Sequence, residues 1–260
     1  MIDDIYNEDC LIGMKRIPDG SVDAIICDLP YGVLNEKSEG GSWDSTIPLA
    51  PLWDQFKRIA KPNAAIIMFA QGMFTARLMM SNEKMWRYNL IWKKGDRVSG
   101  FLNAYKMPLR NHEDICVFYD KLPTYNPQMR KGVPNHTRGN GGVKAVSGCY
   151  GKYNGVVGNV TDEKFPLSVI DIEREHNTSK QFHPTQKPVD LLRYLILTYT
   201  NEGDIVFDPT CGSGTTAIAC IKENRHYIGF ELSEEYFKKA QQRIQAEKAQ
   251  PSLFHNIITE

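Results

Sequence analysis

The stretch DIVFDPTCGSGTTAIAC at Asp204–Cys220, followed by HYIGFELS at His226–Ser233, decides the fold of this chain. A short apolar run ends at Asp208, a glycine-rich turn follows, and helix-forming residues come next. A second apolar run then ends in Glu231. Strand, tight turn, helix and strand in this order make one βαβ unit, which predicts a largely parallel sheet with helices packed on it.

The glycine turn is a candidate ligand site. Gly212 and Gly214 have no Cβ, so backbone N–H groups could come close to a ligand, although a tight turn alone would also use glycine. No lysine follows as in a Walker loop, and the three-glycine dinucleotide fingerprint is absent. Glu231 could accept hydrogen bonds from a ribose diol, and Asp208 could face a positive charge. The pair suits a nucleoside with a cationic tail, of which S-adenosylmethionine is an example.

Alternating strand-like and helix-like segments extend this α/β pattern over the rest of the chain. Strand-like runs lie at Val22–Asp28, Ala64–Ala70, Arg87–Lys94 and Glu113–Tyr119. Helical spacing of apolar residues covers Pro48–Asn63, Phe74–Met85 and Pro188–Thr200. No apolar run is long enough to cross a bilayer.

The strand-like run that begins at Val22 ends in the tetrapeptide Asp28-Leu29-Pro30-Tyr31. Asp and Pro are ordinary turn formers, so one interpretation is a simple strand ending. The other is methyl transfer to the amino group of a base, a poor nucleophile that acceptors on both N–H groups would activate. The Asp28 carboxylate and the Leu29 carbonyl would be those acceptors. Pro30 would stiffen the turn, and Tyr31 would stack on a base taken out of the duplex.

The segment from about residue 121 to 160 differs in composition, being rich in glycine and basic residues and free of Asp and Glu. A loop with solvated charges is one interpretation. Long irregular segments in compact domains usually have a function, however, and this composition suits a phosphate backbone. The candidate DNA-binding residues are Arg130, Lys131, Arg138, Lys144 and Lys152.

The whole-chain composition is that of an ordinary globular protein. Its 260 residues carry a formal net charge of +0, so overall charge does not indicate a nucleic-acid partner. The six cysteines lack the short spacings of zinc or redox sites. We expect reduced thiols and a cytoplasmic protein.

Four motifs in a fixed order resemble those of the β-class amino-methylating DNA methyltransferases. DLPYG at Asp28–Gly32 resembles the family's D-P-P-Y catalytic tetrapeptide, and DPTCGSGTT at Asp208–Thr216 resembles its cofactor loop. HPTQKP at His183–Pro188 is similar to an additional cofactor motif, and NEDC at Asn7–Cys10 to a G-D-C opening segment. The catalytic motif precedes the cofactor motif, which is the circularly permuted order of the DNA enzymes.

The resemblance implies a Rossmann-like S-adenosylmethionine-dependent methyltransferase fold with a mixed seven-stranded sheet. Residues 1–120 would form the catalytic half of the α/β domain and residues 183–260 its cofactor-binding half. Residues 121–182 would form an inserted, irregular target-recognition region lying over the DNA.

Site residues follow from the same resemblance. Asp28, Leu29, Pro30 and Tyr31 would be catalytic, and Asp9 would contact the cofactor adenine. The residues assigned to the cofactor are Asp9, Cys10, His183, Thr185, Lys187, Asp208, Pro209, Thr210, Cys211, Gly212, Ser213, Gly214, Thr215, Thr216, Glu231 and Leu232. Leu29 replaces the family's usual proline, and Thr210-Cys211 stands where the family usually has an apolar residue, often phenylalanine.

The implied function is methyl transfer from S-adenosylmethionine to the N6 amino group of adenine in double-stranded DNA. Asp28 favours adenine, because the cytosine-N4 enzymes usually begin the tetrapeptide with serine. Carbon-5 cytosine methylation is set aside because the chain has no Pro-Cys dipeptide. The alternatives are cytosine-N4 methylation and an inactive DNA-binding relative. No metal or membrane is implied, whereas a homodimer and a cognate restriction enzyme are compatible with the family.

Overall fold

The computed structural model describes residues 1–32, 46–96, 98, 101–134, 145–147, 151–153, 161–174 and 186–249. The chain divides into two compact units. Met1–Asn126 and Ser168–Glu260 form the larger unit, and Pro127–Leu167 form the smaller one. The catalytic and cofactor motifs therefore fall in one unit, and the candidate DNA-binding residues fall in the other.

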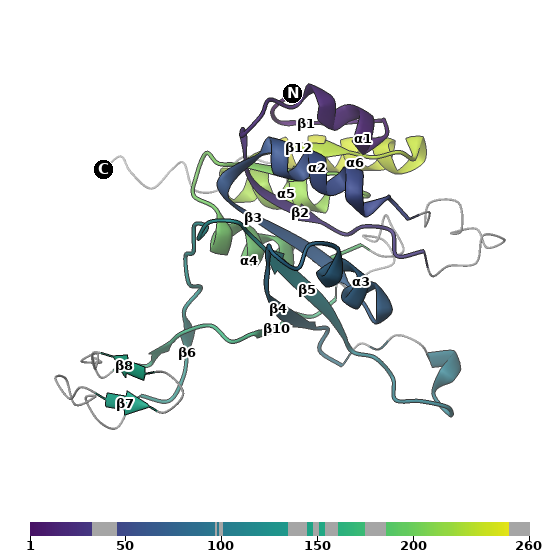
Figure 1. Cartoon of the computed structure of the whole chain (residues 1–260). Coiled ribbons are helices and arrows are strands. Elements are labelled where there is room, and N and C mark those ends of the chain that lie inside the picture. The colour runs from purple at the N-terminus through teal and green to yellow at the C-terminus, as the bar shows by residue number, and fades with distance from the viewer. Residues whose placement is uncertain are drawn as a thin grey trace, which may run out of the picture. The chain divides into compact units, whose positions relative to one another are not determined.

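The larger unit is built on a mixed sheet with the strand order β1-β12-β11-β2-β3-β5-β4-β10 (Figure 1). The strands are β1 (Asp4–Tyr6), β2 (Val22–Cys27), β3 (Ala60–Ala70), β4 (Trp86–Lys93), β5 (His112–Phe118), β10 (Val169–Asp171), β11 (Ile205–Asp208) and β12 (His226–Phe230). β5 runs antiparallel to β3 and β4, and the other neighbouring pairs are parallel. The mixed Rossmann-like fold is confirmed. The described sheet has eight strands where seven were expected, because β10 adds to β4 at the edge after the smaller unit.

Helices cover both faces of this sheet (Figure 1). One face carries α1 (Cys10–Gly13), α2 (Leu49–Ile59) and α3 (Met73–Ser81), and the other carries α4 (Val189–Tyr199), α5 (Thr215–Lys222) and α6 (Glu234–Lys248). Successive strand residues point to opposite faces, so Ile25 packs in the first layer and Ile26 in the second. Burial on both faces explains why the strands read as continuous apolar runs.

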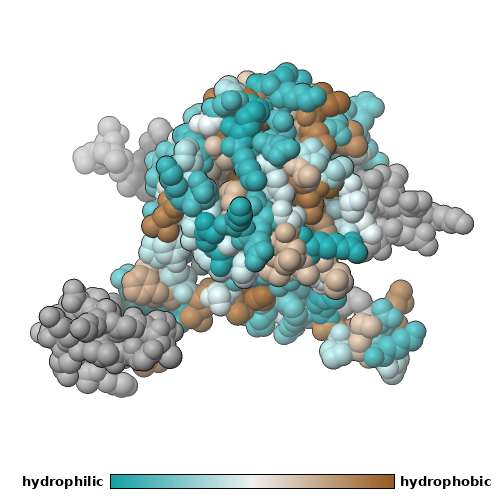
Figure 2. Space-filling view, in the orientation of Figure 1, coloured by the Kyte–Doolittle hydropathy of each residue, from teal (hydrophilic) through white to brown (hydrophobic). Residues whose placement is uncertain are grey.

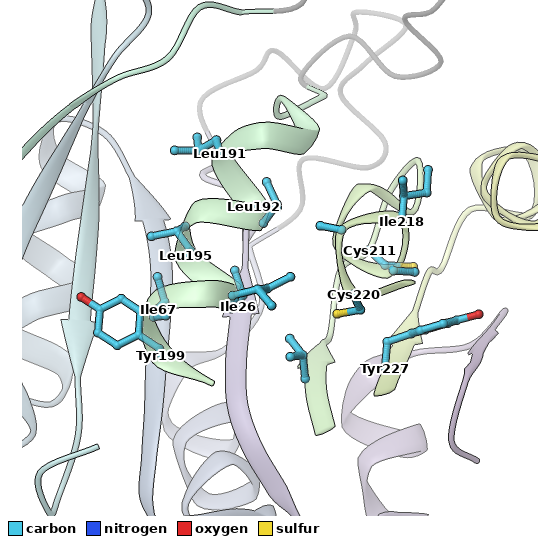
Figure 3. Packing of buried hydrophobic residues seen from close by; sticks show 14 of the residues in the cluster. Ile26, Ile67, Leu191, Leu192, Leu195, Tyr199, Cys211, Ile218, Cys220 and Tyr227 are labelled. Carbon is cyan, nitrogen blue, oxygen red and sulfur yellow. The ribbon is translucent and has the colours of Figure 1, made fainter. Parts of the chain in front are cut away.

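Helix α4 shows how the second layer is packed. Pro188 precedes its first residue, where a missing N–H has no cost. Leu191, Leu192 and Leu195 of α4 are all buried in the cluster of this layer, with Leu192 on the side toward α5 (Figure 3). Ile67 of β3 is fully buried in the same cluster. The helical spacing in the sequence therefore identified the core side of α4 correctly.

The junction of α2 and β3 differs from the sequence prediction. Helical spacing predicted a helix that Pro62 and Asn63 would stop, but α2 ends at Ile59 and β3 begins at Ala60. The register between β2 and β3 shifts here, from Val22 opposite Ala60 to Ala24 opposite Ala65. This irregularity leaves Pro62 and Asn63 exposed, so a proline without an N–H is tolerated at the start of a central strand.

The smaller unit contains short antiparallel pairs. β6 (Arg130–Lys131) pairs with β9 (Glu163–Lys164), and β7 (Ala145–Ser147) pairs with β8 (Gly151–Tyr153). The expected irregular segment thus holds some regular structure. Two further single turns, η1 (Met14–Arg16) and η2 (Phe101–Asn103), belong to the larger unit.

Figure 2 shows hydrophilic side chains across much of the face in view, with hydrophobic ones between them. Within the described residues, no helix is both long and apolar enough to cross a membrane.

Replacing Ile67 by alanine tests the assignment of the core. Ile67 is 0% exposed at the centre of the sheet, so the cavity should lower the free energy of unfolding by about 2–5 kcal/mol. Urea denaturation measures this change. The control is Leu102→Ala, at a side chain that is 96% exposed, which should change stability by less than about 0.5 kcal/mol. Equal effects of the two substitutions would contradict the assignment.

Candidate active site

The two motif loops meet at the centre of the sheet. β11 and β2 are parallel neighbours, so the glycine turn after β11 and the tetrapeptide after β2 leave the same edge. From there the chain continues from β11 to β12 on one side and from β2 to β3 on the other, which makes this the topological switch point where ligands bind in such sheets. The Thr210 hydroxyl donates a 3.1 Å hydrogen bond to the Asp28 carbonyl and joins the two loops directly.

Asp28 lies within a set of polar contacts. The Tyr31 hydroxyl donates to its Oδ1 at 2.7 Å, and the Lys187 ammonium donates to its Oδ2 at 2.5 Å. An ionised carboxylate offers about four acceptor sites, so roughly two stay available to another donor. Asp28 is thus a carboxylate held from two sides that can still accept hydrogen bonds.

Tyr31 is fixed by its ring as well as by its hydroxyl. The ring stacks on Phe74 of α3, with centroids 4.9 Å apart and an interplanar angle of 28°. Burial, followed by the nearby charge of Asp28, raises the pKa of Tyr31 well above its usual value. The phenol therefore remains a protonated donor to Asp28, and Phe74 already covers one face of the ring.

Leu29 contributes its side chain to the core. It is 3% exposed and packs in the layer that includes Phe74 and Leu78. Within the described part of the chain, no N–H or O–H group donates a hydrogen bond to its carbonyl oxygen. A leucine can hold the turn here through packing, which a proline would do through its ring.

The glycine turn is folded around Glu231. Gly212 and Gly214 have φ values of +52° and +76°, which favour glycine. The Gly212 N–H donates to Glu231 Oε2 at 2.9 Å, and the Ser233 N–H donates to Oε1 at 2.8 Å. Burial raises the pKa of Glu231, while these backbone N–H groups act in the opposite direction. Both oxygens keep further acceptor capacity.

Asp208 is a buried carboxylate, 6% exposed. Its Oδ1 accepts from the Thr210 N–H at 3.0 Å and its Oδ2 from the Thr216 hydroxyl at 2.5 Å. Burial raises its pKa to about 7, against the effect of these hydrogen bonds and with smaller contributions from Asp28 and Glu231. No described cation forms an ion pair with it. Such a carboxylate, next to an open turn, is suited to a positively charged ligand.

The segment Asn7–Cys10 adjoins the same end of β12. Asn7 donates to the carbonyls of Glu231 at 2.8 Å and Leu232 at 3.0 Å. Asp9 caps α1 by accepting from the Leu11 N–H at 2.8 Å. Asp9 therefore has a structural function in the described fold, and any ligand contact would be additional.

Of the other predicted cofactor residues, Cys10 is buried at the start of α1, and the rest lie in the turn and at the start of α5. These are Pro209, Cys211, Ser213, Thr215 and Thr216. Cys211 is buried, and a Cβ on Gly229 would meet its Cβ at 3.2 Å, so the local packing leaves little space for a larger side chain. His183 and Thr185 lie outside the described residues.

The candidate DNA-binding residues are only partly described. Arg130 and Lys131 are exposed on β6 of the smaller unit, and Arg130 Nε donates to the Phe165 carbonyl at 3.1 Å. Arg138 and Lys144 fall outside the described residues, and of Lys152 only the backbone in β8 is described.

Three residues that the sequence analysis did not identify contact the site. Glu113 lies 3.2 Å from the Lys187 ammonium and pairs with Lys94, and Arg243 of α6 donates to the Ser213 hydroxyl at 2.9 Å. An acid at the start of the apolar run His112–Phe118 was a usable signal for Glu113. Nothing local in the sequence indicates its partners. Across the described part of the chain, no cluster of three His, Cys, Asp or Glu residues could hold a metal.

Comparison with known proteins gives consistent matches. A profile of the N6/N4 DNA methylase family matches residues 22–242. The Type II methyltransferase M.HpaI of Haemophilus parainfluenzae is 28% identical over 243 residues, which cover 90% of this chain and 71% of that protein. M.HindIII of Haemophilus influenzae, also a Type II methyltransferase, is 25% identical over 95% of this chain and 97% of its own.

Solved structures share the fold. The complex of M1.HpyAVI with SAM superposes with a TM-score of 0.61 at 24% identity, covering 92% of this chain and 98% of that one. The cytosine-N4-specific PvuII DNA methyltransferase superposes with a TM-score of 0.67 at 15% identity, covering 98% and 87%.

The raised pKa of Asp208 predicts a pH-dependent stability without ligand. Between the unfolded pKa of 3.8 and the folded pKa of about 7, the native state holds a proton on Asp208 that the unfolded state has released. Stability from this group therefore falls as pH rises, by up to about 1.4 kcal/mol per pH unit. Asp208→Asn should lack this slope, so the stability difference between wild type and variant, from urea titrations at pH 5 to 8, should decline with pH. A constant difference would contradict the assignment.

Proposed function

Since this chain belongs to the N6/N4 family of DNA methylases, we propose that it transfers a methyl group from S-adenosylmethionine to the N6 amino group of adenine in double-stranded DNA. The observation that carries the proposal is the contact between the two motif loops. Thr210, in the glycine turn, donates to the Asp28 carbonyl at 3.1 Å, so a ligand-binding turn and a carboxylate with free acceptor sites belong to one site.

Two acidic residues beside the glycine turn, Asp208 and Glu231, support the binding of S-adenosylmethionine there. Asp208 is buried without a described cationic partner and has a pKa of about 7, which suits the positive charge of this cofactor. Glu231 holds the turn through Gly212 and keeps acceptor capacity for a ribose. These residues would hold the cofactor, which supplies an electrophilic methyl group when bound.

The tetrapeptide would act on the amino group of the base. Its lone pair is delocalised into the ring, so the nitrogen becomes a better nucleophile when both N–H groups are held by acceptors. Asp28 supplies a carboxylate oxygen and Leu29 a backbone carbonyl. Tyr31 and Lys187 orient the carboxylate through its two oxygens. The target base must leave the duplex to reach them, and the face of Tyr31 that does not stack on Phe74 would receive it.

Adenine is favoured over cytosine by the first residue of the tetrapeptide. Asp28 is the residue that the resemblance associates with adenine N6, whereas serine is associated with cytosine N4. The likeness to the cytosine-N4-specific PvuII enzyme, at 15% identity, concerns the fold alone. Cytosine N4 is the second candidate acceptor.

The smaller unit would recognise the DNA. Its acid-free stretch carries the exposed Arg130 and Lys131 on β6, which would contact phosphates. The Type II designation of the two relatives supports a cognate restriction enzyme, and a homodimer is compatible with the proposal. The five described cysteines are free thiols, in keeping with a cytoplasmic enzyme.

Asp28→Ala tests the catalytic assignment. Loss of one acceptor from the amino group should lower methyl transfer to plasmid DNA by about 100- to 1000-fold. Cofactor affinity should stay within about twofold, because Glu231 and Asp208 are unchanged. Transfer of tritiated methyl groups and equilibrium binding of the cofactor measure the two quantities. Asp54→Ala, at an exposed position of α2, is the control. Full transfer by Asp28→Ala would remove the assignment.

If the smaller unit contacts DNA phosphates, its basic residues should contribute to the salt dependence of DNA affinity. Joint replacement of Arg130 and Lys131 by alanine should weaken DNA binding and reduce the slope of log affinity against log salt by about 1 to 2. The control replaces Lys57 and Lys84, which are exposed and precede β3 and β4. They lie at the edge of the sheet opposite to the two motif loops. Fluorescence anisotropy at several salt concentrations measures the slope. If both pairs of substitutions give the wild-type slope, β6 is not part of the interface.

A further inference from the structure

Four side chains of alternating charge form a continuous chain behind the tetrapeptide. Lys94 pairs with Glu113, Glu113 lies 3.2 Å from the Lys187 ammonium, and Lys187 donates to Asp28 at 2.5 Å. The side chains of Lys94, Glu113 and Lys187 are 5%, 13% and 9% exposed, and that of Asp28 is 25% exposed. The chain of charges thus runs from the interior to the proposed reaction site.

Each of the four residues lies in or next to a different strand or helix. Lys94 follows β4, Glu113 lies in β5, Lys187 precedes α4 and Asp28 follows β2. Aromatic rings hold both ammonium groups in place, since Lys187 Nζ lies 4.9 Å from the Phe69 centroid and Lys94 Nζ lies 5.1 Å from the Trp92 centroid. The four residues thus link separate parts of the chain to the Asp28 carboxylate, which Lys187 contacts directly.

Stability alone does not explain such a cluster. Removing charges from water costs several kcal/mol per ion, and well-packed apolar residues usually stabilise a core as well as a buried ion pair does. Glu113 Oε2 is also buried and makes no hydrogen bond, although the Lys187 ammonium lies within ion-pair distance. The Lys187 ammonium thus lies between two acids, 2.5 Å from Asp28 and at a longer distance of 3.2 Å from Glu113.

We propose that Glu113 and Lys94 are positioning residues for methyl transfer, which act by setting how the Lys187 ammonium is shared between Glu113 and Asp28. The inference rests on the proposed function. With Lys94 in place, the charge of Glu113 is largely satisfied, so Lys187 stays on Asp28. With Glu113 in place, Lys187 does not neutralise Asp28 completely. The carboxylate then stays oriented and still accepts hydrogen bonds strongly from the target amine.

The two single substitutions should shift the Lys187 ammonium in opposite directions, toward Asp28 in one variant and toward Glu113 in the other. Glu113→Gln leaves Lys187 with Asp28 as its sole acid and makes Asp28 a weaker acceptor. Lys94→Met leaves Glu113 with Lys187 as its sole cation and draws the ammonium away from Asp28. Lys94 acts on Lys187 through Glu113, so the double variant leaves Lys187 with Asp28 as its sole acid, as Glu113→Gln does, and the loss of Lys94 has no further effect.

The test is a double-mutant cycle on the full chain, with S-adenosylmethionine and plasmid DNA at saturating concentrations. Each single variant should lower the single-turnover rate constant by about 10- to 100-fold, with cofactor KM within about twofold. The double variant should have the rate constant of Glu113→Gln, with no further loss from Lys94→Met. Lys93→Met is the matched control, because this neighbouring lysine pairs with Asp171 at the surface and should leave the rate unchanged.

A pH profile keeps the test decisive if a single variant does not fold. Burial lowers the pKa of Lys94, against the attraction of Glu113, and Lys187 and Arg174 lower it further. Lys94 should lose its proton at a lower pH than an ordinary lysine, so the wild-type rate should fall on the alkaline side. The double variant has no ammonium there and should lack this fall.

The inference would be overturned if the losses of the two single variants added up in the double variant and the rate constant of each variant fell with its thermal midpoint. Glu113 and Lys94 would then have a structural role only. A wild-type rate for Glu113→Gln would overturn it as well. Failure of the proposed function is a different result, in which the wild-type chain transfers no methyl group to DNA under any of these conditions.

Discussion

The pairing of β11 with β2 is the constraint on which the site depends. It places two loops next to each other that are 180 residues apart in sequence, from Asp28 to Asp208, and the Thr210 hydrogen bond to the Asp28 carbonyl joins them. Core packing on both faces holds the two strands in register, with Ile25 and Ile26 in opposite layers. The geometry between ligand turn and carboxylate is therefore set by rigid elements, which is what a transfer between two bound molecules requires.

Acidic side chains at this switch point have different environments and therefore different tasks. Asp208 is buried, with a pKa of about 7, and would be charged most favourably when a cation is bound. Asp28 is held by Tyr31 and Lys187 and keeps part of its acceptor capacity. Glu231 folds the glycine turn through backbone N–H groups. One class of side chain can thus bind a cofactor, activate an amine and shape a loop, because burial and partners differ.

The sequence predicted the elements of the fold and the two motif loops, because these signals are local. Apolar runs, the glycine turn and the acid after each strand can all be recognised within about ten residues. The contacts of Lys187 could not be predicted in this way. Its motif predicts a cofactor contact, which stays a prediction, and the structure adds contacts with Asp28 and Glu113, which are 159 and 74 residues away along the chain. The two edge strands β1 and β10 were missed because each has only three residues and gives little periodic signal.

The most direct test of the account is the identity of the methylated nucleoside. Purified protein is incubated with double-stranded DNA and S-adenosylmethionine carrying an isotopically labelled methyl group, and the DNA is digested and examined by mass spectrometry. The account predicts labelled N6-methyldeoxyadenosine. Labelled N4-methyldeoxycytidine would contradict the choice of base, and unlabelled DNA from a protein that binds the cofactor would contradict the catalytic assignment itself.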